Sequence, residues 1–399
     1  MIADLHIHYP MHLISDPDVD LTLRRMARLR HRRRIREWGR AFLLKKASEV
    51  FNYPGHTKQH RVDSDRMRAA AVRLGFSVLY LPASEFRPGF TDPPSSSDVQ
   101  ELFDQLREVE RVVELEPGLT FAHDREELDA GLADPDLTVL VHCVEGGFQL
   151  GATEDEICDT VKKLKEKGVV YVTLAHLFWR HIATNANAFP FLRDDQYHAV
   201  FHERDDGLSD LGKAAIRAMV ENRMLIDVAH MDDAALGKTF DYLRKIEDTP
   251  TPVLATHVAT RRGVNGLDYN ITRKTAAEIA RRGGVIGLIM GDHIVTDGLL
   301  PDAREFGGRR TRNFGDTFDC LRAHIDTLYE WCGNSYDHIG IGSDLDGFVK
   351  PTVAGIDFVD QMDDLESAIS GHYSDPGIAD KICSGNALQI LRDYVWTEV

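Results

Sequence analysis

Side chains of the kind that bind metal ions recur in this sequence where apolar runs end. In the opening D-L-H-I-H run, His6 and His8 occupy alternate positions, so in an extended chain both imidazoles point to the same side. Glu145 comes directly after the apolar run that ends at Val144, and two glycines follow it. A carboxylate there is costly to bury unless it is paired or coordinates metal. We expect Glu145 to bridge two metal ions, with helix capping or a salt bridge as the alternative.

Two further histidines close later apolar runs and complete a set of ligands. His230 follows the run Leu225 to Ala229, and His257 follows the run Val253 to Thr256. A single histidine at the end of a strand is commonly a hydrogen-bonded structural group, and H-x-H pairs are frequent by chance. The four histidines together with Glu145 nevertheless supply the nitrogen and oxygen ligands that suit Zn²⁺ and similar ions. We therefore predict a site for two divalent ions, with Zn²⁺ as the expected metal.

Two more residues have the chemistry for proton transfer and polarisation. Asp344 emerges from the glycine-lined run I-G-I-G-S-D, and a carboxylate beside cations stays ionised and can accept a proton from water. We assign Asp344 as general acid and base, with Asp346 as the alternative. His176 follows the run Thr173 to Ala175, and we assign it to substrate binding, where it would polarise the substrate carbonyl. The set predicts metal-assisted hydrolysis by a water that the two ions share.

Short runs rich in Val, Ile and Leu precede these polar residues, and segments with helical spacing separate the runs. This pattern is typical of a parallel sheet covered by helices. The expected strands are Ile2 to His8, Phe76 to Pro82, Thr138 to Val144, Val169 to Ala175, Met224 to Ala229, Pro252 to Thr256, Gly284 to Met290 and His338 to Ser343. Eight strands alternating with helices favour an α/β fold, a closed (β/α)8 TIM-like barrel, over an open sheet. Its strand ends would bring the candidate residues together.

The same reading predicts helices and long connections around the barrel. We expect helices at Glu154 to Lys167 and at Ser209 to Asn222, with Ser209 as an N-cap. Leu119 to Ala122, followed by a helix-like segment, is a ninth candidate strand. Long insertions after strands are expected at residues 9–62, 86–115 and 292–318, where barrel loops build active sites.

The 399 residues suffice for one large barrel or for two smaller domains. No repeat or linker-like tract divides the chain, so we expect a single domain over residues 1–399. A basic segment at about 20–50, densest between Arg24 and Lys46, carries arginines interleaved with apolar residues. That pattern predicts an inserted surface helix or an oligomer contact, with binding of an anionic ligand or a membrane as the alternative.

A net charge of −17 argues against nucleic acid as a partner. No apolar run approaches the roughly 20 residues that cross a bilayer, and the first residues lack a secretory pattern. We expect a cytoplasmic protein without membrane contact. The cysteines form no C-x-x-C pair and should be reduced thiols: Cys143, Cys158, Cys320, Cys332 and Cys383.

These motifs resemble those of the membrane (renal) dipeptidase family, within the binuclear amidohydrolase-like barrels. The resemblance runs from Asp63 to the end of the chain, and its motifs are specific when taken together. The matching stretches are Arg66 to Pro82, Val141 to Gly151, Tyr171 to His176, Gly207 to Lys213 leading to His230, His257 with its loop, Gly342 to Gly347 and Gly385 to Leu388.

The resemblance implies a zinc-dependent dipeptidase, with a dipeptide or a similar small amide as substrate, and a homodimer. It implies that His6, His8 and Glu145 hold one ion, and that Glu145, His230 and His257 hold the other. It further implies that His176 and Asp344 contact the substrate and move protons.

The sequence departs from the family pattern at two positions. Members of the family usually have D-x-H-x-D on the first strand, and here His8 replaces the second carboxylate. Neutral imidazole leaves the site one charge unit more positive and changes its preference among metals. The family also places an arginine before an asparagine to hold the substrate carboxylate, whereas here Tyr269 precedes Asn270. We therefore name Tyr269 and Arg261 as substrate-binding candidates, with Arg262 nearby.

Two other classes of function remain open at this point. One is a hydrolase of another small substrate on the same barrel, such as a lactam, a lactone, an N-acyl amino acid or a phosphoester. The opening D-L-H-I-H also resembles polymerase-and-histidinol-phosphatase type phosphoesterases, although their further histidine motifs are missing. The other is a barrel that binds a ligand without catalysis and keeps its metal as structure. A residue placed for acid and base chemistry argues against it, because structural metal sites are normally closed.

Overall fold

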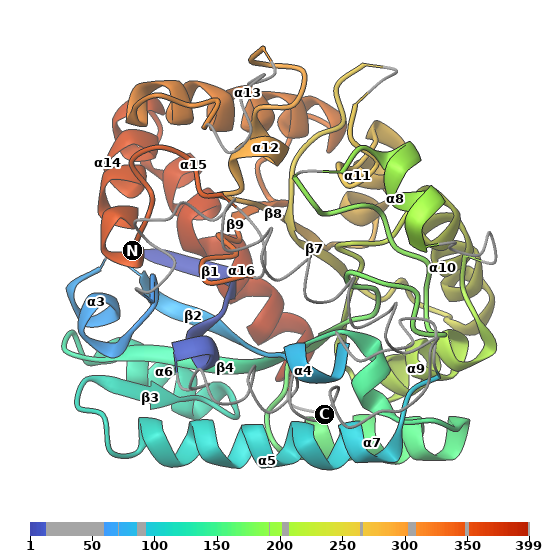
Figure 1. Cartoon of the computed structure of the whole chain (residues 1–399). Coiled ribbons are helices and arrows are strands. Elements are labelled where there is room, and N and C mark those ends of the chain that lie inside the picture. Colours follow the sequence, from blue (N-terminus) through green and yellow to red (C-terminus); the bar gives the residue numbers. More distant parts are fainter. Residues whose placement is uncertain are drawn as a thin grey trace, which may run out of the picture.

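Nine parallel strands form the centre of the fold in the computed structural model of the protein (Figure 1). The structure describes residues 1–12, 60–70, 72–85, 93–190, 192–201, 207–263, 266–301, 309–347 and 351–397, so the predicted basic helix lies outside the described residues. The strands are β1 (Ile2–Ile7), β2 (Val72–Leu79), β3 (Leu119–Phe121), β4 (Thr138–Glu145), β5 (Tyr171–Thr173), β6 (Leu225–Asp227), β7 (Val253–Val258), β8 (Val285–Leu288) and β9 (Ile339–Ile341).

Eight of these strands close into a barrel. They follow the order β2-β1-β9-β8-β7-β6-β5-β4, and pairing of β2 with β4 closes the ring. The ninth strand, β3, pairs with the first residues of β4, beginning at Leu119 and Thr138, whereas β5 pairs with the last residues of β4. The predicted (β/α)8 barrel is confirmed, and the ninth candidate strand is an addition outside the ring. The second strand begins at Val72, before the predicted Phe76, because Arg73 and Gly75 interrupt its apolar run.

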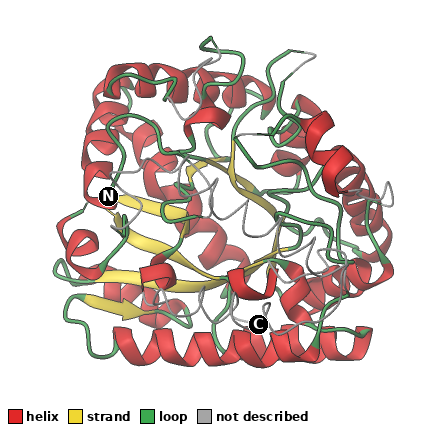
Figure 2. Ribbon diagram, in the orientation of Figure 1, coloured by secondary structure: helices red, strands yellow, loops and turns green. Residues whose placement is uncertain are grey.

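Helices cover the outer face of this barrel (Figure 2). The predicted helices at 154–167 and 209–222 are confirmed as α7 and α9, and the Ser209 hydroxyl caps α9 by accepting from the Gly212 amide. The helices are α3 (Ser64–Ala69), α4 (Pro82–Glu85), α5 (Ser96–Val113), α6 (Arg125–Ala133), α7 (Glu154–Glu166), α8 (Asp194–Phe201), α9 (Asp210–Glu221), α10 (Asp233–Ile246), α11 (Arg273–Arg281), α12 (Asp292–Val295), α13 (Phe314–Trp331), α14 (Met362–His372), α15 (Pro376–Asp380) and α16 (Asn386–Ile390). None of the helices among these described residues is long and apolar enough to cross a membrane.

Short helical turns complete the elements. The 3-10 turn η1 (Tyr9–His12) follows β1, and η2 (Gly147–Leu150) follows β4. A third 3-10 turn, η3 (Val359–Gln361), precedes α14. The π turns η4 (Lys381–Gly385) and η5 (Leu391–Val395) flank α16, and together with α15 they make one helical segment at the end of the described chain. The predicted insertion at 86–115 contains α5, and the one at 292–318 contains α12. The insertion at 9–62 falls mostly outside the described residues.

The apolar interior of the barrel is sealed at one end by that helical segment. Leu5, Phe76 and Val141 from the strands pack in one cluster with Ile390 and Leu391. Burying a side chain of this size fully contributes about 1.5–3 kcal/mol, so the segment is an integral part of the barrel core. The opposite end, where the strands finish, is left for loops and polar side chains. All five cysteines are free, as the sequence predicts.

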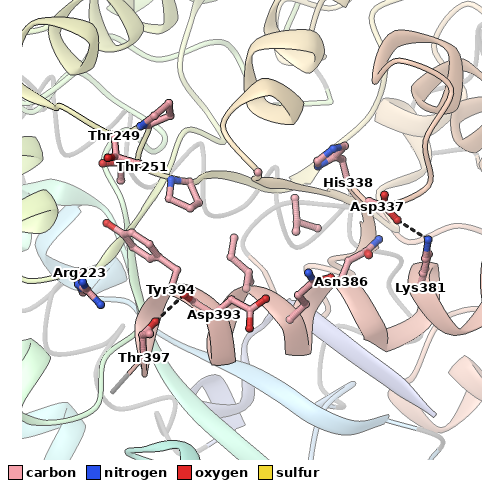
Figure 3. A pocket seen from close by; sticks show the side chains of 16 residues that line it. Arg223, Thr249, Thr251, Asp337, His338, Lys381, Asn386, Asp393, Tyr394 and Thr397 are labelled. Carbon is pink, nitrogen blue, oxygen red and sulfur yellow. Dashed lines mark hydrogen bonds and ion pairs between the residues drawn. The ribbon is translucent and has the colours of Figure 1, made fainter. Parts of the chain in front are cut away.

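A cavity of about 850 Å³ lies at the sealed end of the barrel (Figure 3). Its walls include Arg223, Pro252 and His338, which precede β6, β7 and β9, together with Asn386 and Tyr394 of the helical segment. In (β/α)8 enzymes the chemistry occurs at the carboxyl ends of the strands, and the other end serves stability. We therefore place the candidate functional site at the other end of the barrel.

His324 docks α13 onto the barrel and makes the stability of the fold depend on pH. Its Nε2–H donates to the Val295 carbonyl at 2.8 Å, and the Thr260 hydroxyl donates to its Nδ1 at 2.7 Å. Burial lowers the pKa of His324 from 6.5 to about 4. Its contribution to stability is therefore complete above pH 6.5 and is lost as the pH falls towards 4, because the unfolded chain takes up a proton first.

We expect His324 to account for about 3 kcal/mol of stability lost between pH 7.5 and pH 4. Urea unfolding at both pH values should show this loss in the wild type and a smaller one in His324→Gln. His372→Gln, which changes an exposed histidine of α14, should behave as the wild type. Parallel pH profiles of wild type and His324→Gln would show that His324 is not the titrating group.

Candidate metal centre and catalytic site

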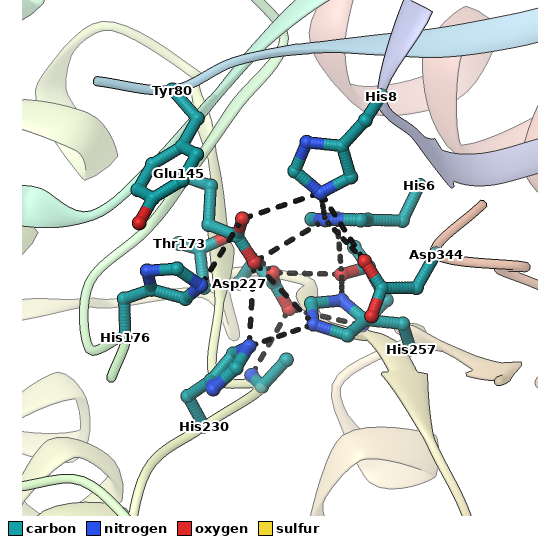
Figure 4. Close-up of polar contacts among 12 residues, drawn as sticks. His6, His8, Tyr80, Glu145, Thr173, His176, Asp227, His230, His257 and Asp344 are labelled. Carbon is teal, nitrogen blue, oxygen red and sulfur yellow. Dashed lines mark hydrogen bonds and ion pairs between the residues drawn. The ribbon is translucent and has the colours of Figure 1, made fainter. Parts of the chain in front are cut away.

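The five predicted metal ligands converge at the carboxyl ends of four strands (Figure 4). His6 and His8 come from the end of β1, Glu145 is the last residue of β4, His257 lies near the end of β7, and His230 follows β6 by three residues. All five are at most 1% exposed. The sequence prediction that these residues meet at one end of a closed barrel therefore agrees with their positions in the structure.

The carboxylate of Glu145 is the centre of this cluster. Its Oε1 lies 3.3 Å from the Nε2 atoms of His6 and His230 and 3.5 Å from that of His257. Its Oε2 lies 3.4 Å from His8 Nε2. Burial alone would raise the pKa of Glu145, but the surrounding histidines, first His176 and then His6, hold it well below its usual value. The carboxylate is therefore ionised and faces imidazole nitrogens on both sides.

Hydrogen bonds on the far side of two of these rings fix their tautomers. The Tyr171 hydroxyl donates to the Leu5 carbonyl at 3.0 Å, so its oxygen accepts from His6 Nδ1 at 2.8 Å. The Thr256 hydroxyl donates to Asp227 at 2.8 Å and in the same way accepts from His257 Nδ1 at 2.8 Å. Nδ1 is therefore the donor in each ring, and in the neutral form of the ring Nε2 presents a lone pair to Glu145.

Asp227 anchors this supporting layer. Its carboxylate accepts hydrogen bonds from the hydroxyls of Thr173 at 2.5 Å and Thr256 at 2.8 Å. It also accepts from the amides of Thr256 and Ala229 at 3.0 and 3.1 Å. Burial raises its pKa, which these hydrogen bonds oppose. Loss of a partner that orients a metal ligand in this way typically lowers metal affinity or activity by roughly 10- to 100-fold.

The residues present fit a pair of divalent ions. In the neutral form of His6, lone pairs on its Nε2 and on Glu145 Oε1 face each other at a buried position, and Glu145 Oε1 makes no hydrogen bond to any described residue. Such a pairing is unfavourable unless a cation lies between the two atoms. Two ligands about 2.0–2.2 Å from a tetrahedral ion lie about 3.3–3.5 Å apart, which agrees with the contacts around Glu145. The 2.9 Å contact between the Nε2 atoms of His230 and His257 is somewhat shorter.

Asp344 lies beside this cluster, held by an unusual backbone. Its Oδ1 is 3.2 Å from His8 Nε2, and its amide donates to the His6 carbonyl at 2.9 Å. Its φ of 56° and that of His230, 66°, lie in the left-handed region, which is costly for residues other than glycine and is frequent at functional sites. A side chain at Gly347 would collide with the Asp344 carboxylate, so this turn requires glycine.

Asp346, the alternative acid and base, makes hydrogen bonds to the backbone of another segment. Its carboxylate accepts hydrogen bonds from the amides of Arg61 and Val62 at 2.8 and 2.9 Å. These bonds join the turn after β9 to the segment that leads into α3. Asp346 therefore shapes the rim of the site, while Asp344 faces the ligand cluster.

His176 is positioned by a buried carboxylate. Its Nδ1 lies 2.5 Å from Glu85 Oε2, and its Nε2 lies 3.3 Å from Glu145 Oε2. Glu85 also accepts from the Tyr80 hydroxyl at 2.7 Å and from the Leu177 amide at 3.0 Å. Burial and then the charge of Glu85 raise the pKa of Tyr80 well above its usual value, so that hydroxyl remains a donor. The Glu85 carboxylate can thus stabilise a protonated His176 ring.

The two substrate-binding candidates that follow β7, Tyr269 and Arg261, have different surroundings. The buried Tyr269 hydroxyl donates to the His257 carbonyl at 3.0 Å, and its ring meets His230 edge to face with centroids 5.0 Å apart. Arg261 pairs with Asp233 at 2.7 Å and donates to the carbonyls of Asp268 and Asn270. Tyr269 therefore belongs to the cluster, whereas these contacts direct the Arg261 guanidinium towards α10 and its own loop. The structure does not bring Arg261 together with the ligands.

The residues that make hydrogen bonds to the ligands and to His176 were not identified from the sequence. Asp227 carried a signal, because an acid within an apolar strand needs partners. Tyr171, Thr256 and Glu85 carried none, because tyrosine and threonine are ordinary strand residues and Glu85 lies 91 positions from the ring it holds.

The chain matches a known protein family over nearly its whole length. The family model described as membrane dipeptidase (peptidase family M19) matches residues 3–396. A relative, an uncharacterized protein in the pqqA 5' region of Klebsiella pneumoniae, is 27% identical over 192 residues, or 48% of this chain and 62% of that protein. Dipeptidase tcpJ of Claviceps purpurea is 22% identical over 333 residues, 83% of this chain and 69% of that one.

A solved structure has the same fold. A metallopeptidase from Rhodobacter sphaeroides, liganded with a phosphinate mimic of the dipeptide L-Ala-D-Ala, aligns with a TM-score of 0.68 at 19% identity, covering 99% of each chain. This likeness shows that the closed parallel barrel is shared. The chain belongs to the membrane dipeptidase family.

Proposed function

We propose that this protein is a zinc-dependent dipeptidase, which hydrolyses the amide bond of a dipeptide or of a closely related small molecule. Membership of the membrane dipeptidase family supports this reaction. The observation that carries it is the convergence of four histidines on the buried Glu145, with lone pairs of His6 and Glu145 facing each other at 3.3 Å.

In this proposal His6, His8 and Glu145 hold one ion, and Glu145, His230 and His257 hold the other. When bound, two such ions make a water acidic near neutral pH and polarise the carbonyl under attack. The His6 and His257 rings are fixed by Tyr171 and Thr256, so the donor atoms are oriented before any ligand arrives. His8 makes the first ion site less negative than the usual carboxylate would.

The protein side chains then move the protons. The Asp344 carboxylate accepts the proton of the attacking water as the new C–O bond forms. It returns that proton to the amide nitrogen as the C–N bond breaks, so the amine leaves neutral. In the protonated form that the Glu85 carboxylate would stabilise, His176 donates from Nε2 to the carbonyl oxygen as negative charge develops there.

Recognition of the substrate carboxylate is the point at which this protein should differ from its family. The position of the family arginine holds Tyr269, whose hydroxyl is bound to the His257 carbonyl, and the Arg261 guanidinium is bound to Asp233. Neither offers the bidentate cation that normally clamps a carboxylate. We propose that the substrate is selected chiefly at the scissile amide.

A substrate panel tests both parts of this proposal. We expect the Zn²⁺-loaded protein to cleave dipeptides and not phosphomonoesters. Free and C-terminally amidated forms of one dipeptide should differ by less than about tenfold in kcat/KM, since a charge-assisted clamp would contribute about 1.5–3 kcal/mol, roughly 10- to 150-fold.

The panel separates the possible failures. Cleavage of phosphomonoesters without any amide hydrolysis would overturn the proposed reaction. A preference of 100-fold or more for the free carboxylate would show instead that a cation does hold it, and would overturn only the proposal on recognition.

A further inference from the structure

A second cluster of metal-ligand side chains lies outside the barrel. Glu110 of α5, His123 in the connection between β3 and α6, and His142 of β4 have one potential ligand atom each within 4.8 Å of one another. His142 alternates with Val141 and Cys143, which face the barrel interior, so its ring points outward towards the covering helices. This cluster shares no residue with the candidate active site.

The contacts converge on one oxygen atom. Glu110 Oε1 lies 3.2 Å from His123 Nε2 and 3.6 Å from His142 Nε2. Ligands about 2.0–2.2 Å from a tetrahedral ion lie about 3.3–3.5 Å apart. The three donor atoms thus already have nearly the spacing that one shared ion would impose.

His142 is the buried member, and the structure leaves its ring nitrogens without a partner. The side chain is fully buried, and neither Nδ1 nor Nε2 makes a hydrogen bond to any described residue. The 3.6 Å contact with Glu110 is too long to count as one. The Phe121 ring stacks on the imidazole, with centroids 3.9 Å apart and 20° between the planes. Burial lowers the pKa of His142, which leaves a neutral ring with a lone pair.

His123 is oriented as metal-binding histidines usually are. Glu127 Oε2 lies 2.8 Å from its Nδ1 and also accepts from its amide at 2.8 Å. A carboxylate behind the ring fixes the proton on Nδ1 and turns Nε2 towards the ion. The side chain is 37% exposed, and that of Glu110 is 23% exposed, so water can reach the cluster and complete the coordination.

We propose that Glu110, His123 and His142 form a third metal site, which binds one Zn²⁺ ion with water as the fourth ligand. The alternative, a protonated His123 between Glu110 and Glu127, would pair those three residues but would leave Nε2 of His142 unsatisfied, whereas the ion would bind that atom. The ion would join α5 and the β3–α6 connection to β4, three residues before Glu145. This inference does not depend on the proposed function.

Metal counting at a fixed concentration of free Zn²⁺ tests the proposal. After equilibrium dialysis, wild-type protein should contain one more equivalent of zinc than His123→Ala or Glu110→Gln. His372→Ala, which removes a surface histidine of α14, serves as the matched control and should equal the wild type. Added Zn²⁺ should raise the Tm of the wild type by more than that of either variant, while dipeptide hydrolysis stays unchanged in all four proteins.

Two variants are used so that a folding defect in one of them cannot decide the result. Glu110→Gln keeps the size and shape of the side chain. Equal zinc content in wild type, His123→Ala and Glu110→Gln would overturn the proposal and would identify the cluster as a hydrogen-bonded network.

Discussion

Asp344→Asn is expected to lower kcat by roughly 100- to 10,000-fold, the usual contribution of general acid and base catalysis, while the bound metal ions are retained. The substitution keeps the size of the side chain but removes its ability to accept the proton of the attacking water. Asp344 is 5% exposed and lies 3.2 Å from His8 Nε2, close to the ligands without being one of the five. Steady-state kinetics with a dipeptide, together with elemental analysis of the same preparation, measures both quantities.

Asp346→Asn is the matched control for this prediction. Its carboxylate accepts from the Arg61 and Val62 amides, so its loss should destabilise the fold by about 1–3 kcal/mol and change kcat by much less. Unchanged turnover in Asp344→Asn would remove Asp344 from its assigned role. A kcat loss in Asp346→Asn as large as that in Asp344→Asn would show that the acid and base was assigned to the wrong carboxylate.

Glu145→Gln is expected to have the second large effect, through loss of the active-site ions themselves. An uncharged amide cannot bridge two cations, and the Lewis acid contribution of several kcal/mol corresponds to a loss of roughly 1,000-fold or more in kcat/KM. The four histidines would remain close together, but no carboxylate would lie between them to balance the positive charge of the ions. Metal analysis and kinetics should both respond, in contrast to Asp344→Asn, where only the kinetics should.

Glu166→Gln, at an exposed position of α7, controls for the loss of one charge and should match the wild type. A Glu145→Gln protein with full metal content and normal turnover would contradict the bridging role. The zinc ion proposed at Glu110, His123 and His142 should be unaffected by the change at Glu145.

The sequence was sufficient to predict the eight strands of the barrel and the convergence of the ligands. His6, Glu145 and His257 lie at the carboxyl ends of apolar runs, and a parallel barrel has only one end where such residues can meet. The inference needed no side-chain detail, because topology alone brings these strand ends together.

The supporting hydrogen bonds could not be predicted in this way. Thr173, Asp227 and Thr256 sit on three neighbouring strands and meet only because their side chains point to the same layer of the barrel. Glu85 reaches His176 from α4 across the site. Such contacts depend on register and rotamer, which a single sequence does not specify, whereas strand ends depend only on the pattern of apolar runs.

The departures from the family pattern have physical consequences in the structure. His8 places an imidazole ring 3.2 Å from Asp344, at a position where the family has a carboxylate. Tyr269, in the place of the arginine, holds the His257 carbonyl and packs against His230. Both changes leave the five candidate ligands together and alter the charge and the packing beside them.

Zinc-edge anomalous diffraction from crystals grown with Zn²⁺ tests the central claim most directly. We predict two anomalous peaks flanking the Glu145 carboxylate, one against His6 and His8 and the other against His230 and His257. Crystals that show no anomalous peak within bonding distance of Glu145 would contradict the account.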